Sequence, residues 1–320
     1  MVDHVQTLNQ AQTLQHLPFP GLIDAIEQMF IEGCTVPLRH NHAIEGAHGD
    51  NGGIMLLMPA WQSGKRLGIK TVSIFPGNQD KGLPGLHSVF ILYDAATGKP
   101  LAILDGDVIT SRRTAAASAL AARWLSRPDA SKLLVVGAGR VASLLADAYR
   151  CERPIETVQV WDINAEAAAR LVSQLQASGL QASVATDLEQ ASRQADIITC
   201  ATLSNAPLIH GDWLRPGTHL DLIGSFTPAM IESDVECFRK GTVFVDTPEA
   251  LMKAGDILEA VKAGAFQPEQ VAATLEDLCR GQHAGRRDAA EITVYKAVGT
   301  ALEDIAAASL AFDSYMQAAH

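Results

Sequence analysis

The sequence predicts an α/β protein in which a doubly wound parallel sheet is joined to an α+β part. In the second half of the chain, short apolar runs alternate with helical patterns, and a glycine-rich turn follows the first of these runs. The N-terminal part instead carries successive strand patterns. A chain of 320 residues also exceeds the usual size of a single hydrophobic core, so we expect two domains.

The N-terminal part is predicted to contain one amphipathic helix followed by a largely antiparallel sheet. Apolar residues recur at helical spacing over residues 22–30. Runs rich in β-branched and aromatic residues predict strands at residues 54–58, 67–75 and 87–93, with glycine-containing breaks between them. Residues 93–100 lie between two apolar runs and have the composition of a hairpin turn.

The second part is predicted to alternate strands and helices. Alanine and leucine dominate residues 114–125, which predicts a helix that bridges the two parts. Residues 165–177 are a further helical pattern, and residues 292–316 predict a long last helix returning to the first domain. The expected strands are residues 132–136, 158–161, 197–200, 220–223 and 243–245. We therefore expect one domain of residues 1–113 with 294–320, and a second of residues 114–293.

Composition excludes several classes of partner. Lys and Arg number 25 against 36 Asp and Glu, giving a net charge of -11 without a basic stripe, so nucleic acid is not expected to bind. The sequence shows neither a signal-peptide pattern nor a membrane-spanning stretch, and the five cysteines form no C-x-x-C pair, so we expect a cytoplasmic protein. His40, His42 and His48 lack a convincing third ligand, and no metal is expected.

A G-x-G-x-x-A turn, residues 137–142, follows the first strand of the second part directly. Gly137 permits the tight turn, Gly139 lets the backbone approach a pyrophosphate, and the small Ala142 lets helix and strand pack closely. The phosphates would meet the positive end of the following helix. This combination predicts a dinucleotide-binding Rossmann domain.

Asp162 follows the second strand of that domain, where an acidic side chain can accept hydrogen bonds from the adenosine ribose. Its charge would also repel a 2′-phosphate, and the next residues, Ile163 and Asn164, offer no cation to hold one. NAD(H) is therefore favoured, and NADP(H) stays open as an alternative.

Six segments of the chain resemble the ornithine cyclodeaminase/mu-crystallin family. They are Pro37-Leu38-Arg39, Leu57-Met58-Pro59, Gly68-Ile69-Lys70, residues 102–110, residues 113–118 and residues 292–299. The resemblance covers nearly the whole chain. It implies an N-terminal domain that binds substrate and forms a homodimer, a Rossmann domain, and an active site between the two.

The resemblance also implies roles for individual residues. Arg39, Lys70 and Arg113 would hold the α-carboxylate of a substrate, and Lys70 could also act as an acid. His87 is expected either to contact the substrate or a water, or to be structural. Thr114 would begin a helix and face the cofactor phosphates. The full set expected at the cofactor is Arg113, Thr114, Gly137, Ala138, Gly139, Arg140, Val141, Asp162, Thr202 and Gly224.

Two departures from the family's cyclodeaminases set the expected reaction. Leu56 stands where those enzymes carry a Glu for the distal ammonium, and Phe226 stands where they carry an acidic base. Apolar surroundings suit the cyclic ketimine reductases of the family, which reduce 1-pyrroline-2-carboxylate to proline or 1-piperideine-2-carboxylate to pipecolate with NAD(P)H. An alanine-type amino-acid dehydrogenase and a non-catalytic binding protein like mu-crystallin stay open, and ornithine cyclodeaminase is disfavoured.

Overall fold

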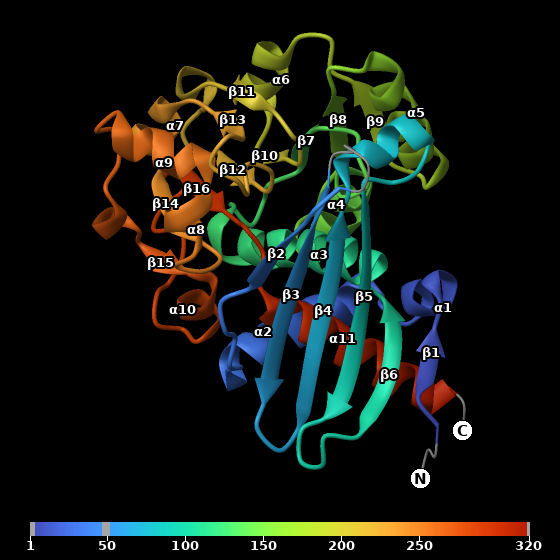
Figure 1. Ribbon diagram of the computed structural model, residues 1–320. Helices are drawn as coiled ribbons and strands as arrows, with labels where there is room; N and C mark the ends of the chain where they lie inside the picture. The colour runs from blue at the N-terminus through green and yellow to red at the C-terminus, as the bar shows by residue number, and fades with distance from the viewer. Residues whose placement is uncertain (1–3, 47–51, 319–320) are drawn as a thin grey trace. The chain divides into compact units, whose positions relative to one another are not determined.

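The computed structural model describes residues 4–46 and 52–318. The chain forms two compact units, one of residues 1–113 with 300–320 and one of residues 114–299 (Figure 1). None of the helices within the described ranges is long and apolar enough to span a membrane.

The first unit is built on a six-stranded sheet in the order β1-β6-β5-β4-β3-β2. All neighbouring strands are antiparallel except β1 and β6, which confirms the largely antiparallel sheet and the hairpin between β5 and β6. Its strands are β1 Gln6–Leu8, β2 His40–Ile44, β3 Gly53–Gln62, β4 Arg66–Ile74, β5 Leu86–Asp94 and β6 Pro100–Asp105. Its helices are α1 Gln10–Gln15, α2 Phe19–Glu32, the 3-10 turn η2 Pro76–Lys81 and α11 Ala301–Ala318.

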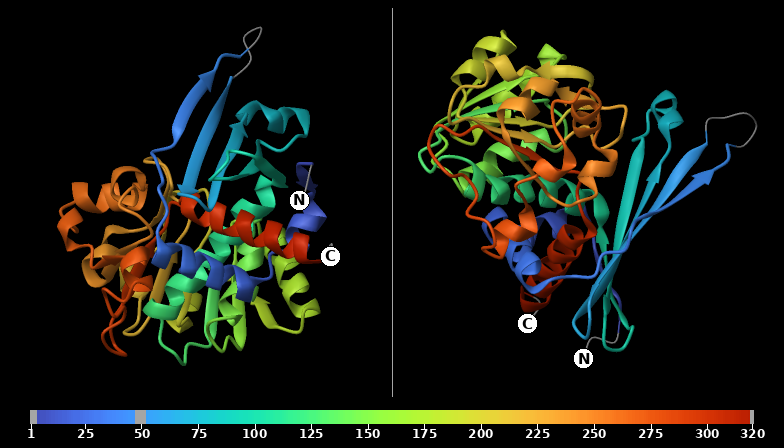
Figure 2. Two further views of the ribbon diagram at one scale, coloured as in Figure 1. Left: turned by 90° about the horizontal axis from the view of Figure 1, so that it is seen from below. Right: turned by 90° about the vertical axis from the view of Figure 1, so that its left-hand side faces the viewer.

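The two faces of this sheet differ in their cover. Helix α11 packs on one face over the buried side chains of Met58, Val72 and Phe90, and helix α2 packs against α11, as Figure 2 shows. Because side chains alternate along a strand, the residues between these point to the other face. That face carries both apolar and polar side chains, and the apolar Val89 and Ile103 on it are 41% and 38% exposed.

The second unit contains an eight-stranded parallel sheet in the order β15-β14-β16-β12-β10-β7-β8-β9, which confirms the Rossmann-type fold. Its strands are β7 Lys132–Val136, β8 Thr157–Trp161, β9 Gln181–Val184, β10 Ile197–Cys200, β12 His219–Leu222, β14 Thr242–Val245, β15 Ala273–Thr274 and β16 Thr293–Lys296, with β11 Asn205–Ile209 and β13 Ile231–Ser233 paired separately. Its helical elements are α4 Ala142–Arg150, α5 Ala165–Ala177, α6 Leu188–Gln194, η3 Gly211–Trp213, α7 Val235–Lys240, α8 Ala250–Lys253, α9 Gly255–Lys262, η4 Pro268–Gln270 and α10 Leu275–Cys279.

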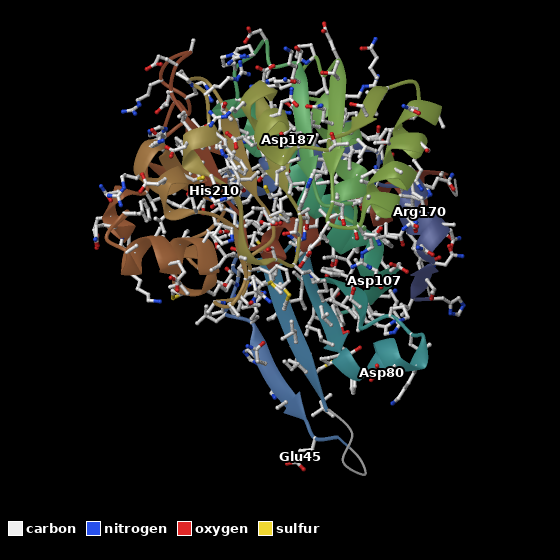
Figure 3. The ribbon with its side chains drawn as sticks, turned by 90° about the horizontal axis from the view of Figure 1, so that it is seen from above. Glu45, Asp80, Asp107, Arg170, Asp187 and His210 are labelled. Atoms are coloured by element: carbon white, nitrogen blue, oxygen red, sulfur yellow. The ribbon has the colours of Figure 1, made fainter. Side chains whose placement is uncertain are left out.

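The bridging helix is longer than predicted. Helix α3 spans Gly106–Leu125, because the side chain of Asp105 accepts a hydrogen bond from the backbone N–H of Val108 and caps the helix start. Asp107, which Figure 3 labels, lies in its first turn. Thr114 is therefore inside the helix, and the expectation that it begins one is wrong.

The predicted last helix over residues 292–316 is also wrong in its first turns. Residues 293–296 form strand β16, which lies between β12 and β14 and is completely buried. A short, fully apolar run gives the same pattern in a buried strand and in a buried helix, so spacing alone did not separate them. Residues 294–299 consequently fall in the second unit, and helix α11 begins at Ala301.

Candidate functional site

The glycine turn of the second unit connects strand β7 to helix α4. Gly137 has a φ of 109°, in the region that favours glycine, and its N–H donates to the carbonyl of Trp161 at the end of β8. A Cβ on Gly137 would lie 2.6 Å from the carbonyl oxygen of Ala201, so this position has no room for a side chain. The turn therefore brings the ends of three neighbouring strands, β7, β8 and β10, together.

No contact within the described residues requires a glycine at position 139. A Cβ there would meet no described protein atom within 4 Å, and its φ lies outside the left-handed region. Helix α4 begins three residues later, and the first N–H groups of a helix have no partner within it. Open space beside these donors fits a phosphate that approaches the backbone, which is the role predicted for the second glycine.

Asp162 is tied to the glycine turn. Its Oδ2 accepts the N–H of Ala138 at 2.7 Å, and its Oδ1 accepts the N–H of Asn164, also at 2.7 Å. An ionised carboxylate offers about four acceptor sites, so these two bonds leave capacity for ribose hydroxyls. Asn164 is occupied as the cap of helix α5, and Ile163 is exposed. The residues of the turn and the acid thus converge as the sequence predicts, and Arg140 beside them is exposed.

Thr202 and Gly224 lie after the neighbouring strands β10 and β12, at the carboxyl end of the sheet, where ligands bind in open parallel sheets. The N–H and the hydroxyl of Thr202 both donate to Oε1 of Glu232, at 2.7 and 2.8 Å. A Cβ on Gly224 would collide with that carboxyl group. Glu232 is a residue that the sequence analysis missed.

In the first unit, Lys70 and Arg113 form a buried cluster with two acids of helix α11. Lys70 Nζ lies 2.7 Å from Oδ2 of Asp304, while Arg113 contacts Oδ1 of Asp304 at 2.9 Å through Nε and Oε2 of Glu303 at 2.6 Å through Nη1. All four side chains are at least nine-tenths buried. Arg39 contributes a third positive charge close enough to act on Lys70. The structure therefore brings together the three predicted cations.

The charges of this cluster are shifted by burial and by each other. The pKa of Lys70 is lowered to about 8, because burial and the charges of Arg113 and Arg39 lower it by more than Asp304 raises it. The pKa of Asp304 is lowered because the pull of Lys70 and Arg113 outweighs its desolvation. Lys70 can thus give up a proton near neutral pH, which an ordinary lysine does not do.

Glu303 and Asp304 were also missed. Their signal in the sequence is a pair of adjacent acids in a helix that is otherwise rich in Ala, Leu and Ile. Acids in the first turn of a helix are commonly explained by the helix dipole, and that explanation hides their role as buried partners of distant cations.

His87 is not brought together with the cluster. It pairs with Ser73, whereas Lys70 pairs with Phe90, and positions 70 and 73 face opposite sides of the sheet. His40 and His42 are exposed on β2, and His48 lies outside the described residues. No group of three potential metal ligands occurs in the described parts of the chain.

The two positions that separate this chain from cyclodeaminases lie in different surroundings. Leu56 pairs with the buried Val72, so it faces the same side of the sheet as Lys70 and adds an apolar side chain there. Phe226 follows Ser225, whose φ of 53° is unusual for a residue with a side chain, and the ring is 44% exposed.

The parallel sheet, the glycine turn and the acid after the second strand define a Rossmann-type dinucleotide-binding protein. The chain belongs to the ornithine cyclodeaminase/mu-crystallin family, whose model matches residues 4–319.

Three relatives show the range of the family around this chain. A protein of Colwellia psychrerythraea named Delta(1)-pyrroline-2-carboxylate reductase is 34% identical over 95% of this chain and 97% of its own length. The structure of the Thermococcus litoralis enzyme of that name, in complex with NADH and L-proline, has a TM-score of 0.91 at 31% identity and covers 98% of each chain. An archaeal alanine dehydrogenase dimer with bound NAD has a TM-score of 0.89 at 32% identity, covering 99% of this chain and 97% of the other.

Proposed function

We propose that this protein is an NAD(P)H-dependent ketimine reductase that converts 1-pyrroline-2-carboxylate to proline or 1-piperideine-2-carboxylate to pipecolate. The observation that carries the proposal is the buried pair of Lys70, on β4, and Arg113, on α3, which share the carboxylate of Asp304. Leu56 lies on the same sheet face as Lys70. Cations held in place by acids can bind a carboxylate, and an apolar neighbour suits a hydrocarbon ring. The relatives named as pyrroline carboxylate reductases support the same substrate class.

The residues of the chain suggest a division of labour. Arg39, Lys70 and Arg113 would bind the substrate carboxylate and orient its ring. The cofactor, when bound, would supply hydride to the carbon of the C=N bond. The ring nitrogen must carry a proton to make that carbon electrophilic, and Lys70, with its pKa near 8, is suited to provide it. Thr114 and Arg113 remain proposed contacts of the cofactor.

For the cofactor we propose NADH. Asp162 keeps acceptor sites for ribose hydroxyls and places a negative charge where a 2′-phosphate would have to bind. The solved relatives bound to NADH and NAD support the nicotinamide assignment.

An alanine-type dehydrogenase is the second candidate, because the archaeal alanine dehydrogenase shares this fold and a carboxylate clamp also suits an open-chain 2-imino acid. Ammonia separates the two, since only the dehydrogenase needs it as a co-substrate.

The test follows the loss of NADH absorbance with purified protein in three parallel reactions, one with each cyclic imine and one with pyruvate and ammonia. A fourth reaction, with ornithine and NAD, measures the release of ammonia. Oxidation of NADH with a cyclic imine supports the proposal. Oxidation only with pyruvate and ammonia overturns it in favour of the dehydrogenase, and ammonia release from ornithine would contradict the roles given to Leu56 and Phe226.

We also propose that a second copy of the chain covers the sheet face that carries Val89 and Ile103. Exposed apolar side chains arranged on one sheet face are typical of a subunit interface. The archaeal relative that is a dimer supports this assignment. For the location of the protein we propose the cytoplasm, because free cysteines are typical of a reducing compartment.

A further inference from the structure

A second buried charge cluster lies in the parallel sheet unit, and the catalytic scheme above does not use it. Glu232 on β13, Asp256 on α9 and Lys296 at the end of β16 are each no more than 1% exposed. Charged side chains are rarely buried so completely unless they are paired or serve a function. The cluster lies against Thr202 and Gly224, two of the residues predicted to contact the cofactor.

Glu232 fixes the segments that follow β10 and β12. Its Oε1 holds both the backbone and the hydroxyl of Thr202, and it occupies the space that a side chain at Gly224 would need. Because Gly224 must stay without a Cβ for Glu232 to fit, the glycine and the acid form one unit. The conformation of both segments therefore depends on this carboxyl group.

Asp256 and Lys296 hold the rest of the cluster. Oδ1 of Asp256 accepts the N–H groups of Glu232 and Ser233 at 2.8 and 3.0 Å, and its Oδ2 accepts the hydroxyl of Ser225. Lys296 Nζ donates to the carbonyls of Leu222, at 3.0 Å, and Gly224. The same Nζ lies 3.6 Å from Oδ2 of Asp256. One cation thus serves two carboxyl groups.

The charge state of Glu232 follows from these neighbours. The pKa of Glu232 is raised to about 8, because burial and the charge of Asp256 raise it by more than Lys296 and Thr202 lower it. Cys200 also faces this group, and its own pKa is raised by burial, so it stays a neutral thiol. Below pH 8 the carboxyl group of Glu232 is therefore mostly protonated. Oε2 of Glu232 is buried and has no hydrogen-bond partner among the described residues.

We propose that Glu232 is a positioning residue for the nicotinamide end of the cofactor and acts through Thr202 and Gly224. The proposal rests on the proposed function, because it takes a nicotinamide dinucleotide as the ligand of this unit. Ligands of open parallel sheets bind at the carboxyl ends of the strands, where both residues lie. Oε2 of Glu232, which lacks a hydrogen-bond partner among the described residues, can interact with a ligand bound beside Thr202 and Gly224.

This position links the protonation of Glu232 to the redox state of the nucleotide. The nicotinamide ring is positively charged in NAD and uncharged in NADH, and a nearby carboxylate stabilises a positive charge. As the pH rises and Glu232 ionises, NAD should bind more tightly relative to NADH. The ratio of the two dissociation constants therefore reports on this residue without any catalytic turnover.

The test measures the dissociation constants of NADH and NAD between pH 6.5 and 9.5 for the wild-type chain, Glu232→Gln and Glu269→Gln. Glu269 is an exposed acid of the same unit and serves as the matched control. The NAD-to-NADH ratio of dissociation constants should fall about tenfold in the wild type and the control, corresponding to a pKa difference of about one unit. It should stay constant in Glu232→Gln, which keeps an acceptor oxygen for Thr202 and should bind NADH like the wild type at pH 6.5.

An identical slope in Glu232→Gln overturns the proposal, and so does a constant ratio in the wild type, which needs no variant to fold. Failure of the wild type to bind either nucleotide would instead overturn the proposed function itself. The two failures are therefore distinguishable.

Discussion

Lys70 shows why a charged side chain persists in an apolar sheet. A lone ammonium group would lose most of its hydration at 2% exposure, but Asp304 lies 2.7 Å away and Arg113 shares the same carboxylate. The remaining cost of burial is visible in its lowered pKa of about 8. A group with this pKa changes charge in the range where most enzymes are assayed.

The first prediction concerns this change of charge. Below pH 8 Lys70 is charged and attracts the substrate carboxylate, and above pH 8 it becomes neutral, so the KM for a cyclic imine should rise by about tenfold between pH 7 and pH 10. In Lys70→Arg the charge persists, and the rise in KM should be absent. Steady-state kinetics over this range with both proteins is the measurement, and equal rises would show that another group is responsible.

Asp162 leads to a prediction about the cofactor. Replacing it by Ser removes the negative charge and keeps an acceptor oxygen for Ala138, so the ratio of kcat/KM for NADPH to that for NADH should increase by about tenfold or more. Asp187→Ser is the control, because Asp187, labelled in Figure 3, caps helix α6 and serine also caps helices. An unchanged preference in Asp162→Ser would contradict the role given to the acid.

Individual site residues could be predicted from the sequence where the residues that act together lie close along the chain. The glycine turn and Asp162 are close in the sequence, and the structure joins them through Ala138. The acids that hold Lys70 and Arg113 lie far along the chain, on a helix whose start was misplaced, and no local pattern connects them to their cations. The side chains of His87 and Lys70 point to opposite faces of the sheet. This difference depends on the register between β4 and β5, which cannot be read from the sequence.

At the scale of elements, helix α11 both covers the first sheet and neutralises its buried cations. Residues 301–308 of this helix are all buried, including its two acids Glu303 and Asp304. The fold of the unit and the charge of the cluster therefore depend on the same turn. Strand β16 and residues 301–308 of α11 look alike in the sequence because both are buried on all sides and neither presents an exposed polar face.

A pair of substitutions on α11 tests this double role. Asp304→Asn leaves two buried cations without their shared carboxylate, and it should reduce the free energy of unfolding by about 3–5 kcal/mol. Asp313→Asn removes a half-exposed partner of Arg66 on the same helix and should cost about 1 kcal/mol or less. Urea unfolding of both variants is the measurement, and similar losses would mean that the buried cluster contributes no more than a surface pair.

At the scale of the whole molecule, the proposed function divides the binding of cofactor and substrate between the two units. The parallel sheet supplies the groups for a dinucleotide, and the antiparallel unit supplies a buried set of cations and an apolar sheet face. The succession of strand and helix patterns along the chain allowed both the antiparallel and the parallel sheet to be predicted. The boundary at Thr300 was not predicted, because it depends on β16 entering the parallel sheet between β12 and β14.

The apolar sheet face leads to a prediction about assembly. Val89→Lys places a charge within the proposed interface, where its burial would be costly, and should convert a dimer into a monomer. Ile163→Lys, at a side chain that is 92% exposed in the other unit, should leave the dimer intact. Light scattering after size-exclusion chromatography gives both masses, and a wild-type monomer would contradict the assignment.

The central claim is that the protein reduces a cyclic ketimine carboxylate, and product analysis tests it most directly. Purified protein, NADH and 1-pyrroline-2-carboxylate are mixed without ammonia, and proline formed is compared with NADH consumed. The account predicts that one proline is formed for each NADH consumed. With 1-piperideine-2-carboxylate in place of 1-pyrroline-2-carboxylate, it predicts one pipecolate for each NADH. If NADH binds and yet neither amino acid is formed, the claim is contradicted and the protein is a binding protein or acts on an open-chain substrate.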